Sequence, residues 1–324
     1  MENYLVDVPV ALIFFNRPDT FEKVFDAVAK SRPSKLFLIQ DGPRVGREDD
    51  VDNIRKCRDI IKIDWKCEVH EDYSDQNLGC GKRVYTGLNN AFSIVDRLVI
   101  IEDDIVVSDD MLPFCSELLE RYKDDQRIYS ISCMNMLGQY ERCPYSYLFT
   151  SSGGGISGWA TWRRVWKEVD FNLGFVEDRY AMDTFKLYKQ PRLAGKYWGK
   201  LATMVHDSVK SGKKQTAWSY AFLMSTAFTQ NRLAIVSANN LIANIGLMGE
   251  HSKDNKIYTV PRGVRPLYST KTYKLNWPLS HPHYVVDDYI FSKKMQRIAG
   301  SGFFTRYGRA VERRIYMLIP FLGK

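Results

Sequence analysis

The first half of the chain alternates short apolar segments with segments whose apolar residues have helical spacing. These two patterns predict buried strands joined by amphipathic helices. The predicted strands are residues 8–15, 35–40, 66–71, 97–101 and 128–132, and the predicted helices are residues 19–30, 52–63, 81–95 and 111–122. Because such alternation builds βαβ units, we expect an α/β fold with a mostly parallel central sheet flanked by helices. Ligands of such sheets bind beyond the carboxyl ends of the strands.

Composition limits the alternatives to this layout. A chain of 324 residues with 45% apolar residues can bury a large core. No segment approaches the ~20 apolar residues of a membrane span. The N-terminus has no basic region followed by an apolar core, so we expect no signal peptide and a cytoplasmic protein. The six cysteines lack CxxC spacing, so we expect reduced thiols rather than a zinc site or disulfides.

Glu102, Asp103 and Asp104 directly follow the predicted strand 97–101. Three adjacent carboxylates repel one another at the end of a buried strand. A hard divalent cation such as Mg²⁺ or Mn²⁺ would relieve that repulsion. The alternative is an acidic turn in solvent that precedes the next helix.

Other predicted strands also end in polar residues. The first strand is followed by Asn16 and Arg17, and the second by Asp41. The segment NLGCGK, which ends at Lys82, precedes a predicted helix, where Lys82 and Arg83 could meet a phosphate group. Alternatively, Asp41 is a turn residue and the segment is a helix cap. The chain has neither a GxxxxGK[ST] loop nor a GxGxxG motif after the first strand, which disfavours a P-loop or dinucleotide-binding enzyme.

The second half of the chain is less regular. A glycine-rich loop at residues 151–158 precedes residues 159–166, which we expect to form a helix. Helices are also predicted near residues 193–209 and 217–228, and a short strand at 233–236. Residues 252–290 show no clear periodicity and are interpreted as an extended arm that packing on the body could order.

The C-terminal segment from residue 302 mixes arginine with aromatic and aliphatic residues. It could lie on an anionic membrane surface, with arginine side chains on the headgroups. Alternatively, it forms a helix docked on the domain. No recognised nucleic-acid-binding motif accompanies the net charge of +8, so we expect no nucleic-acid partner.

The series VPVALIFFNRP, FLIQDGPR, NLGCGK, LVIIEDDI and GGGISGWATWRRVW resembles GT-A glycosyltransferases. It is similar to a bacterial family related to glycosyltransferase family 2 and to Golgi N-acetylglucosaminyltransferase I. The resemblance covers roughly residues 8–251, and the EDD motif and the downstream GW segment are its most specific parts. It implies a GT-A (Rossmann-like) domain over residues 1–251, with a nucleotide-binding half to about residue 132 and an acceptor half beyond it. Residues 252–324 would form a C-terminal arm and a basic amphipathic helix.

The resemblance also implies roles for individual residues. Asp104 would bind the metal, Mn²⁺ or Mg²⁺, Asp103 would contact the ribose, and Glu102 would help to hold the donor sugar. Asp41 would read the base, and Asn16 and Arg17 would approach the nucleotide.

The loop that contains Gly155 and Gly158 would border the donor sugar and the acceptor, and Trp159 would stack on a sugar face. His251 matches a histidine that follows the core in these families, where it could complete the metal shell. The alternative for His251 is a histidine in a surface loop.

The catalytic base is where the sequence departs from the family. Related enzymes often carry an acid just after a tryptophan in the region of Trp218, but here Ser219 follows. Serine cannot act as a general base at neutral pH without a partner. Asp207 and Glu250 are the alternative candidates, with Glu102 also placed in the catalytic group. The alternative for Trp218 is packing in a helix.

We therefore expect a metal-dependent, inverting glycosyltransferase on the inner face of the cytoplasmic membrane. It would move N-acetylglucosamine or galactose from a UDP-sugar to a surface polysaccharide or a lipid-linked glycan. One alternative is a weak or inactive homologue that binds a glycan or a partner protein. A lower-ranked alternative is a nucleotidyltransferase, which usually has a glycine-rich basic signature near the first strand.

Overall fold

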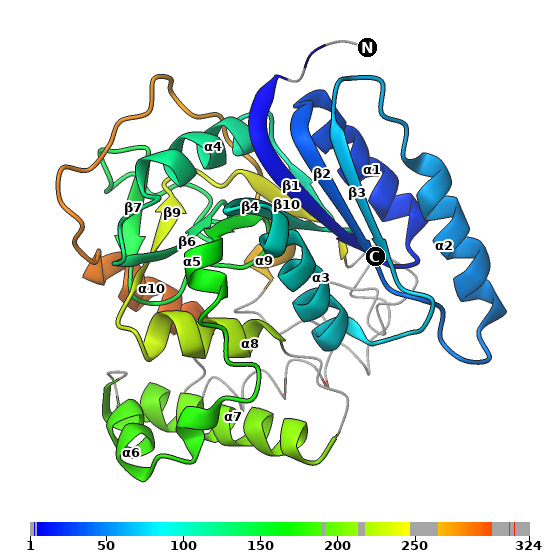
Figure 1. Cartoon of the computed structure of the whole chain (residues 1–324). Helices are drawn as coiled ribbons and strands as arrows, with labels where there is room; N and C mark the ends of the chain where they lie inside the picture. The colour runs from blue at the N-terminus through cyan, green and yellow to red at the C-terminus, as the bar shows by residue number, and fades with distance from the viewer. Residues whose placement is uncertain are drawn as a thin grey trace.

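A computed structural model describes residues 3, 5–188, 192–212, 218–246, 265–299, 311 and 314. The chain folds around one large sheet whose strands follow the order β3-β2-β1-β4-β8-β6-β9-β7 (Figure 1). The strands are β1 (Val6–Phe14), β2 (Pro33–Gln40), β3 (Glu68–Tyr73), β4 (Arg97–Glu102), β6 (Ile128–Ser132), β7 (Tyr147–Thr150), β8 (Trp159–Trp162) and β9 (Leu233–Ser237). Only β7 and β8 run against the common direction, so the sheet is mostly parallel, as predicted.

Helices cover both faces of this sheet. They are α1 (Pro18–Lys30), α2 (Glu48–Ile60), α3 (Cys80–Ile94), α4 (Met111–Arg121), α5 (Arg163–Trp166), α6 (Arg179–Tyr188), α7 (Arg192–Lys210), α8 (Trp218–Phe222), α9 (Pro266–Ser269) and α10 (Tyr289–Ala299). A π-helical segment, η2 (Leu223–Phe228), continues α8. Helices α6 and α7 pack on each other beneath α8 (Figure 1).

Strand β8 shows which helices share a face. Side chains three residues apart in a strand point to opposite faces. Trp159 packs on Phe222 of α8, whereas Trp162 donates a hydrogen bond to the carbonyl of Leu119 in α4. Helix α8 and its neighbour α3 therefore cover one face, and α4 covers the other.

The predicted alternation in the first half is confirmed, with element ends shifted by a few residues. The helix predicted for residues 159–166 is wrong over its first half. Residues 159–162 form β8, which fits between β4 and β6 and pairs antiparallel with both. Strand β8 is buried on both faces, so it lacks the polar alternation that would have identified a strand.

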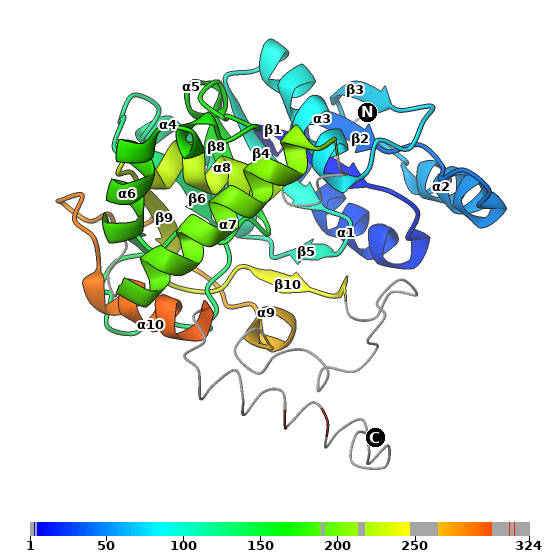
Figure 2. The ribbon, with the colours of Figure 1, turned by 90° about the horizontal axis from the view of Figure 1, so that it is seen from below.

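A small antiparallel ribbon lies beside the main sheet, and the sequence analysis did not predict it. Strand β5 (Ile105–Val107) begins directly after Asp104 and pairs with β10 (Ile242–Asn244). Helix α9 packs on β10, and both lie at the lower edge of the body in Figure 2. The ribbon therefore connects the acidic segment to the C-terminal arm.

The described part of the arm packs on the body. The Asp110 carboxylate accepts hydrogen bonds from the Leu275 backbone N–H (2.9 Å) and from Trp277 Nε1 (2.8 Å). The Asp287 carboxylate accepts hydrogen bonds from the backbone N–H and hydroxyl of Ser151 and from the hydroxyl of Ser292. Residues 252–264 and most of the segment from residue 302 lie outside the described residues, and so does the predicted amphipathic helix.

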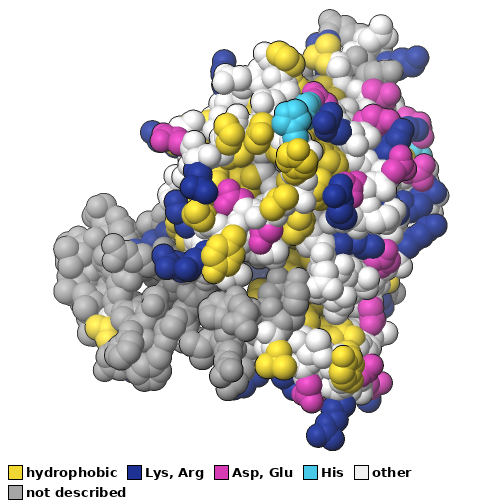
Figure 3. Space-filling view, turned by 90° about the vertical axis from the view of Figure 1, so that its left-hand side faces the viewer, with side chains coloured by type: hydrophobic (Ala, Val, Ile, Leu, Met, Phe, Trp, Pro, Cys, Tyr) yellow, Lys and Arg dark blue, Asp and Glu magenta, His cyan; other side chains and the backbone are white. Residues whose placement is uncertain are grey.

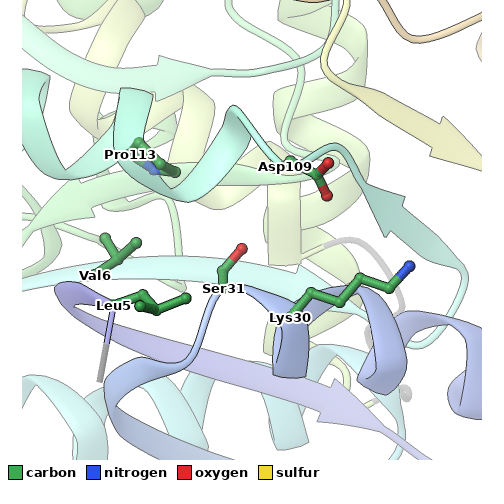
Figure 4. Close-up of a pocket in the computed structure, with 6 residues that line it drawn as sticks. All are labelled: Leu5, Val6, Lys30, Ser31, Asp109 and Pro113. Carbon is green, nitrogen blue, oxygen red and sulfur yellow. The ribbon is translucent and has the colours of Figure 1, made fainter. Parts of the chain in front are cut away.

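A hollow of about 500 Å³ opens at the amino end of β1, at the sheet edge opposite to the acids (Figure 4). Its lining includes Lys30 and Ser31 from the end of α1 and Asp109 and Pro113 near the start of α4. No helix within the described ranges is long and apolar enough to cross a membrane.

Candidate functional site

Strands β2, β1 and β4 end together at one edge of the sheet. Phe14 of β1 pairs with Gln40 of β2, and Ile13 of β1 pairs with Glu102 of β4. The segments that follow these strands therefore share one edge. The structure brings together there the predicted residues Asn16, Arg17, Asp41, Glu102, Asp103 and Asp104.

The aspartates of the acidic segment lie beside Arg17. Nη1 of Arg17 is 3.6 Å from Oδ1 of Asp103 and 3.5 Å from Oδ2 of Asp104. The two carboxylates are largely enclosed, with 13% and 20% of their side chains exposed. The Phe15 backbone N–H also donates to Asp103 Oδ2 at 3.2 Å. At these separations Arg17 offers charge compensation more than short hydrogen bonds.

Positive charge in the cluster does not balance the negative charge. Burial, followed by the charges of Asp104 and Asp103, raises the pKa of Glu102 to about 8. Burial raises the pKa of Asp103 to about 6, although Arg17 opposes the change. Burial likewise raises the pKa of Asp104, against the effect of Arg17. Desolvation and like charges destabilise the ionised carboxylates, so a bound cation would stabilise this arrangement.

The backbone after β10 closes on the outermost acid. Ile245 N–H donates to the Asp104 carbonyl at 2.8 Å. A methyl group on Gly246 would overlap Asp104 Oδ2 and would lie 3.1 Å from Oδ1 of Asn244. Position 246 therefore requires glycine, because any side chain there would overlap the Asp104 carboxylate in its observed position.

The donor set fits a hard cation that keeps open positions. Among the described residues, no group of three or more His, Cys, Asp or Glu side chains forms a ready-made metal cage. Mg²⁺ commonly uses one or two carboxylates and takes its remaining ligands from water and phosphate oxygens. Asp104 could supply such a carboxylate, with the Asp103 carboxylate next to it in the chain.

Asp41 is buried and faces the loop that leads into α3. Its carboxylate accepts hydrogen bonds from four N–H groups: backbone Gly42 (3.0 Å), Leu78 (2.9 Å) and Gly79 (2.9 Å), and Nδ2 of Asn77 (3.1 Å). The base-reading role expected for Asp41 stays a prediction.

The two cations of the NLGCGKR segment differ in their surroundings. Lys82 is exposed in the first turn of α3. Arg83 is buried and donates to the Gln40 carbonyl (3.1 Å) and to the Asp72 carboxylate (2.6 Å). The phosphate contact predicted for Arg83 is therefore wrong, because its guanidinium group holds β2, β3 and α3 together.

Asn16 is also buried. Its Nδ2 donates to Oδ1 of Asp50 at 2.6 Å, and Arg44 pairs with the same carboxylate through two side-chain hydrogen bonds of 2.7 Å. Within the described residues, Oδ1 of Asn16 has no hydrogen-bond partner. Asn16 therefore sits inside a polar cluster that ties the end of β1 to the start of α2.

The predicted donor-sugar loop is packed tightly. Methyl groups at Gly155 and Gly158 would collide with the side chains of Met134 and Ile242, and Gly158 has a φ of +60°. Trp159 is only 1% exposed, so the sugar stacking predicted for it is not available in this structure. Trp218 is buried against Trp159, which agrees with helix packing.

The candidate bases are dispersed. Asp207 is exposed on α7, whose packing partners include α6 and α8. Glu250 and His251 lie outside the described residues. Of the candidates that the structure describes, Glu102 alone belongs to the acidic cluster.

One side chain that the sequence pattern did not predict is influenced by the charge of the acids. Tyr268 of α9 is half-buried, and its pKa is raised by burial and then by the charge of Asp104, while Arg17 opposes the shift. The arm therefore carries a side chain, Tyr268, whose ionisation depends on the charge of Asp104. The sequence offered no signal for this, because residues 252–290 have no periodicity that would place Tyr268.

No protein-family model and no curated protein matches the sequence. Among solved structures, one similar chain is a UDP-glucose pyrophosphorylase complexed with UDP-glucose (10% identity, 74% of this chain and 94% of that chain, TM-score 0.34). Another is a mannose-1-phosphate geranyltransferase from Thermus thermophilus (11% identity, 75% of each chain, TM-score 0.32). A third is a 4-diphosphocytidyl-2C-methyl-D-erythritolsynthase from Anaerococcus prevotii (10% identity, 69% of this chain and 99% of that chain, TM-score 0.28). At this similarity, none of them carries an argument about the activity of this chain.

Proposed function

We propose that this protein is a metal-dependent, inverting glycosyltransferase that uses a UDP-sugar donor. The sugar would be N-acetylglucosamine or galactose, and the acceptor a surface polysaccharide or a lipid-linked glycan. The observation that carries the proposal is the cluster of Glu102, Asp103 and Asp104 at the carboxyl end of β4, next to the ends of β1 and β2.

The uncompensated negative charge of the cluster supports the binding of a divalent cation, which would in turn bind the diphosphate of the donor. The raised pKa values of Glu102 and Asp103 indicate that the ionised acids are not fully compensated by Arg17. A divalent cation would compensate them and, as a Lewis acid, would stabilise a departing nucleoside diphosphate. In this proposal Asp104 binds the cation, Asp103 contacts the ribose, and Glu102 faces the donor sugar. Arg17 and Lys82 supply positive charge for the diphosphate.

The proposal is tested by measuring nucleoside diphosphate release from a set of sugar nucleotides, with Mn²⁺ and then with EDTA. We expect release from a UDP-sugar that EDTA abolishes. Asp104→Asn should lose at least about 100-fold in rate, whereas the exposed Asp109→Asn, at the opposite edge, should match the parent protein. Equal rates in Asp104→Asn and the parent would contradict the metal assignment.

Two further measurements separate the alternatives. A nucleotidyltransferase would instead release pyrophosphate from UTP and a sugar phosphate. An inactive homologue would show no donor binding by calorimetry at millimolar UDP-sugar with Mn²⁺.

We further propose that the protein attaches to the inner face of the cytoplasmic membrane. The described arm supports this, because it exposes several large apolar side chains: Trp277, Tyr284, Val286, Tyr289 and Ile290. Residues 265–299 contain six lysine or arginine residues and only two acids, Asp287 and Asp288, both of which accept hydrogen bonds within the protein. Figure 3 shows hydrophobic side chains gathered on this side of the molecule, with lysine and arginine side chains nearby. Aromatic groups flanked by cations suit an anionic lipid interface.

Vesicle co-sedimentation tests this attachment. Vesicles that contain phosphatidylglycerol should bind the protein, and pure phosphatidylcholine vesicles should bind it less. Replacing Trp277 and Tyr289 by serine should weaken binding about tenfold, which corresponds to about 1.4 kcal/mol. The control is Tyr180→Ser on α6, another exposed aromatic residue. Equal losses in both variants would contradict the assignment of the arm.

A further inference from the structure

We propose that Asp41 is a positioning residue, which fixes the loop of residues 74–80 so that α3 begins beside the acidic cluster. This inference rests on the proposed function, since it assigns Asp41 an effect on the diphosphate part of the donor. It differs from base reading because Asp41 would act through the loop.

The Asp41 carboxylate has little capacity left for a ligand. A carboxylate offers about four lone-pair sites. Four N–H groups already donate to it, and three of them belong to Asn77, Leu78 and Gly79. Asp41 is also only 6% exposed. A base that bound to this carboxylate would have to displace the loop.

The residues on either side of Asp41 hold the same loop. The Gln40 carbonyl accepts a hydrogen bond from Ser74 N–H at 3.0 Å. The Gly42 carbonyl accepts one from Nδ2 of Asn77 at 2.9 Å. A methyl group on Gly42 would lie 2.6 Å from the backbone nitrogen of Gln76 and 2.7 Å from the carbonyl oxygen of Ser74. The end of β2 is therefore in close contact with the loop backbone, independently of the carboxylate.

The loop leads directly to the site. Gly79 has a φ of +81°, which favours glycine, and it is the residue from which α3 starts. The end of β2 that holds this loop lies at the same edge of the sheet as the acids at the end of β4, with β1 between the two strands. The contacts at Asp41 therefore fix the start of α3, with its first backbone N–H groups and Lys82, at this edge of the sheet. A shift of the loop would move these donors away from a diphosphate held at the acids.

Two substitutions test this in different ways. Asp41→Asn removes the charge and presents an amide to N–H donors. Gly42→Ala leaves the Asp41 carboxylate in place but pushes on the backbone of Ser74 and Gln76. Calorimetry with Mn²⁺ should show that both variants bind UDP and pyrophosphate about tenfold more weakly than the parent. Uridine affinity and the ratio of UDP to CDP affinity should be unchanged.

The opposite pattern would overturn the inference. If Asp41→Asn loses the discrimination between UDP and CDP while Gly42→Ala keeps parental UDP affinity, Asp41 reads the base. Hydrogen exchange of residues 74–80 without ligand gives a second readout. It should be faster in both variants, whereas exchange of the core strands β1 and β4 should be unchanged. Parental exchange in both variants would also overturn the inference. A parent protein that binds no UDP would instead contradict the proposed function and leave the exchange result valid.

Discussion

Replacing Glu102 by glutamine should stabilise the protein in a pH-dependent way. The side chain lies in the acidic cluster, where burial and the neighbouring aspartates raise its pKa from 4.5 to about 8. Glutamine has a similar volume and no charge. It therefore removes the ionisation that the folded state disfavours.

The size of the effect follows from proton linkage. Between pH 4.5 and about pH 8, the unfolded chain has lost the Glu102 proton while the folded protein largely retains it. The folded state binds more protons in this window, so its free energy of unfolding falls as the pH rises. One proton contributes about 1.4 kcal/mol for each pH unit, which gives an upper value of about 3 kcal/mol at pH 7. Because the cluster is partly open to solvent and its acids share protons, we expect about 2 kcal/mol.

Urea unfolding in EDTA, from pH 4.5 to pH 8.5, measures this difference. Glu102→Gln and the parent should have equal stability near pH 4.5, and the variant should be increasingly more stable up to about pH 8. Glu22→Gln, at an exposed position on α1, is the matched control and should follow the parent at every pH. A constant difference between Glu102→Gln and the parent across the range would refute the reasoning.

Three further predictions concern packing and hydrogen bonding, at the site and elsewhere in the fold. Gly246→Ala should weaken Mn²⁺ binding about tenfold in titration calorimetry, because the added methyl group overlaps the Asp104 carboxylate; parental affinity would contradict this. Trp65→Phe should lower the free energy of unfolding by about 1–3 kcal/mol more than Trp159→Phe. Both side chains are 1% exposed, but Nε1 of Trp65 donates to the Pro33 carbonyl, whereas Nε1 of Trp159 has no partner within the described residues. Asp287→Asn should speed proteolysis within residues 265–299, because it weakens the hydrogen bonds that hold the arm to Ser151; unchanged cleavage would contradict this.

The β-α alternation in the first half was predictable for a physical reason. Strands β1, β2 and β4 are apolar over most of their length, and α1 presents its apolar residues on one face. Each local pattern agreed with the place of its element in the sheet, so neighbours in space did not have to be known. The helix prediction for residues 159–166 was wrong over residues 159–162. Their tryptophans have helical spacing, but the position between β4 and β6 in the sheet requires an extended strand.

The acidic segment was the part of the candidate site most visible in the sequence. Three adjacent acids after an apolar strand repel one another and are costly to bury, and this is evident without any knowledge of the fold. The partners of these acids were less visible. Gly246 lies against the Asp104 carboxylate because β10, which precedes Gly246, pairs with β5, which follows Asp104. Tyr268 of α9 lies where the charge of Asp104 affects its pKa. Both lie more than a hundred residues away in the chain, where no spacing relates them to the acids.

The sequence by itself determined the class of the fold and the place of the acids, because strand and helix periodicity and the order of the segments are local properties. The tertiary structure decided which polar side chains remain free to act. Arg83 and Trp159 have types suited to ligand contact, yet the structure buries both. Asp41 likewise became the anchor of a loop, since four N–H groups from the chain around it fill its carboxylate. Such occupancy depends on which backbone groups packing brings within hydrogen-bond distance, and no single segment of the sequence encodes it.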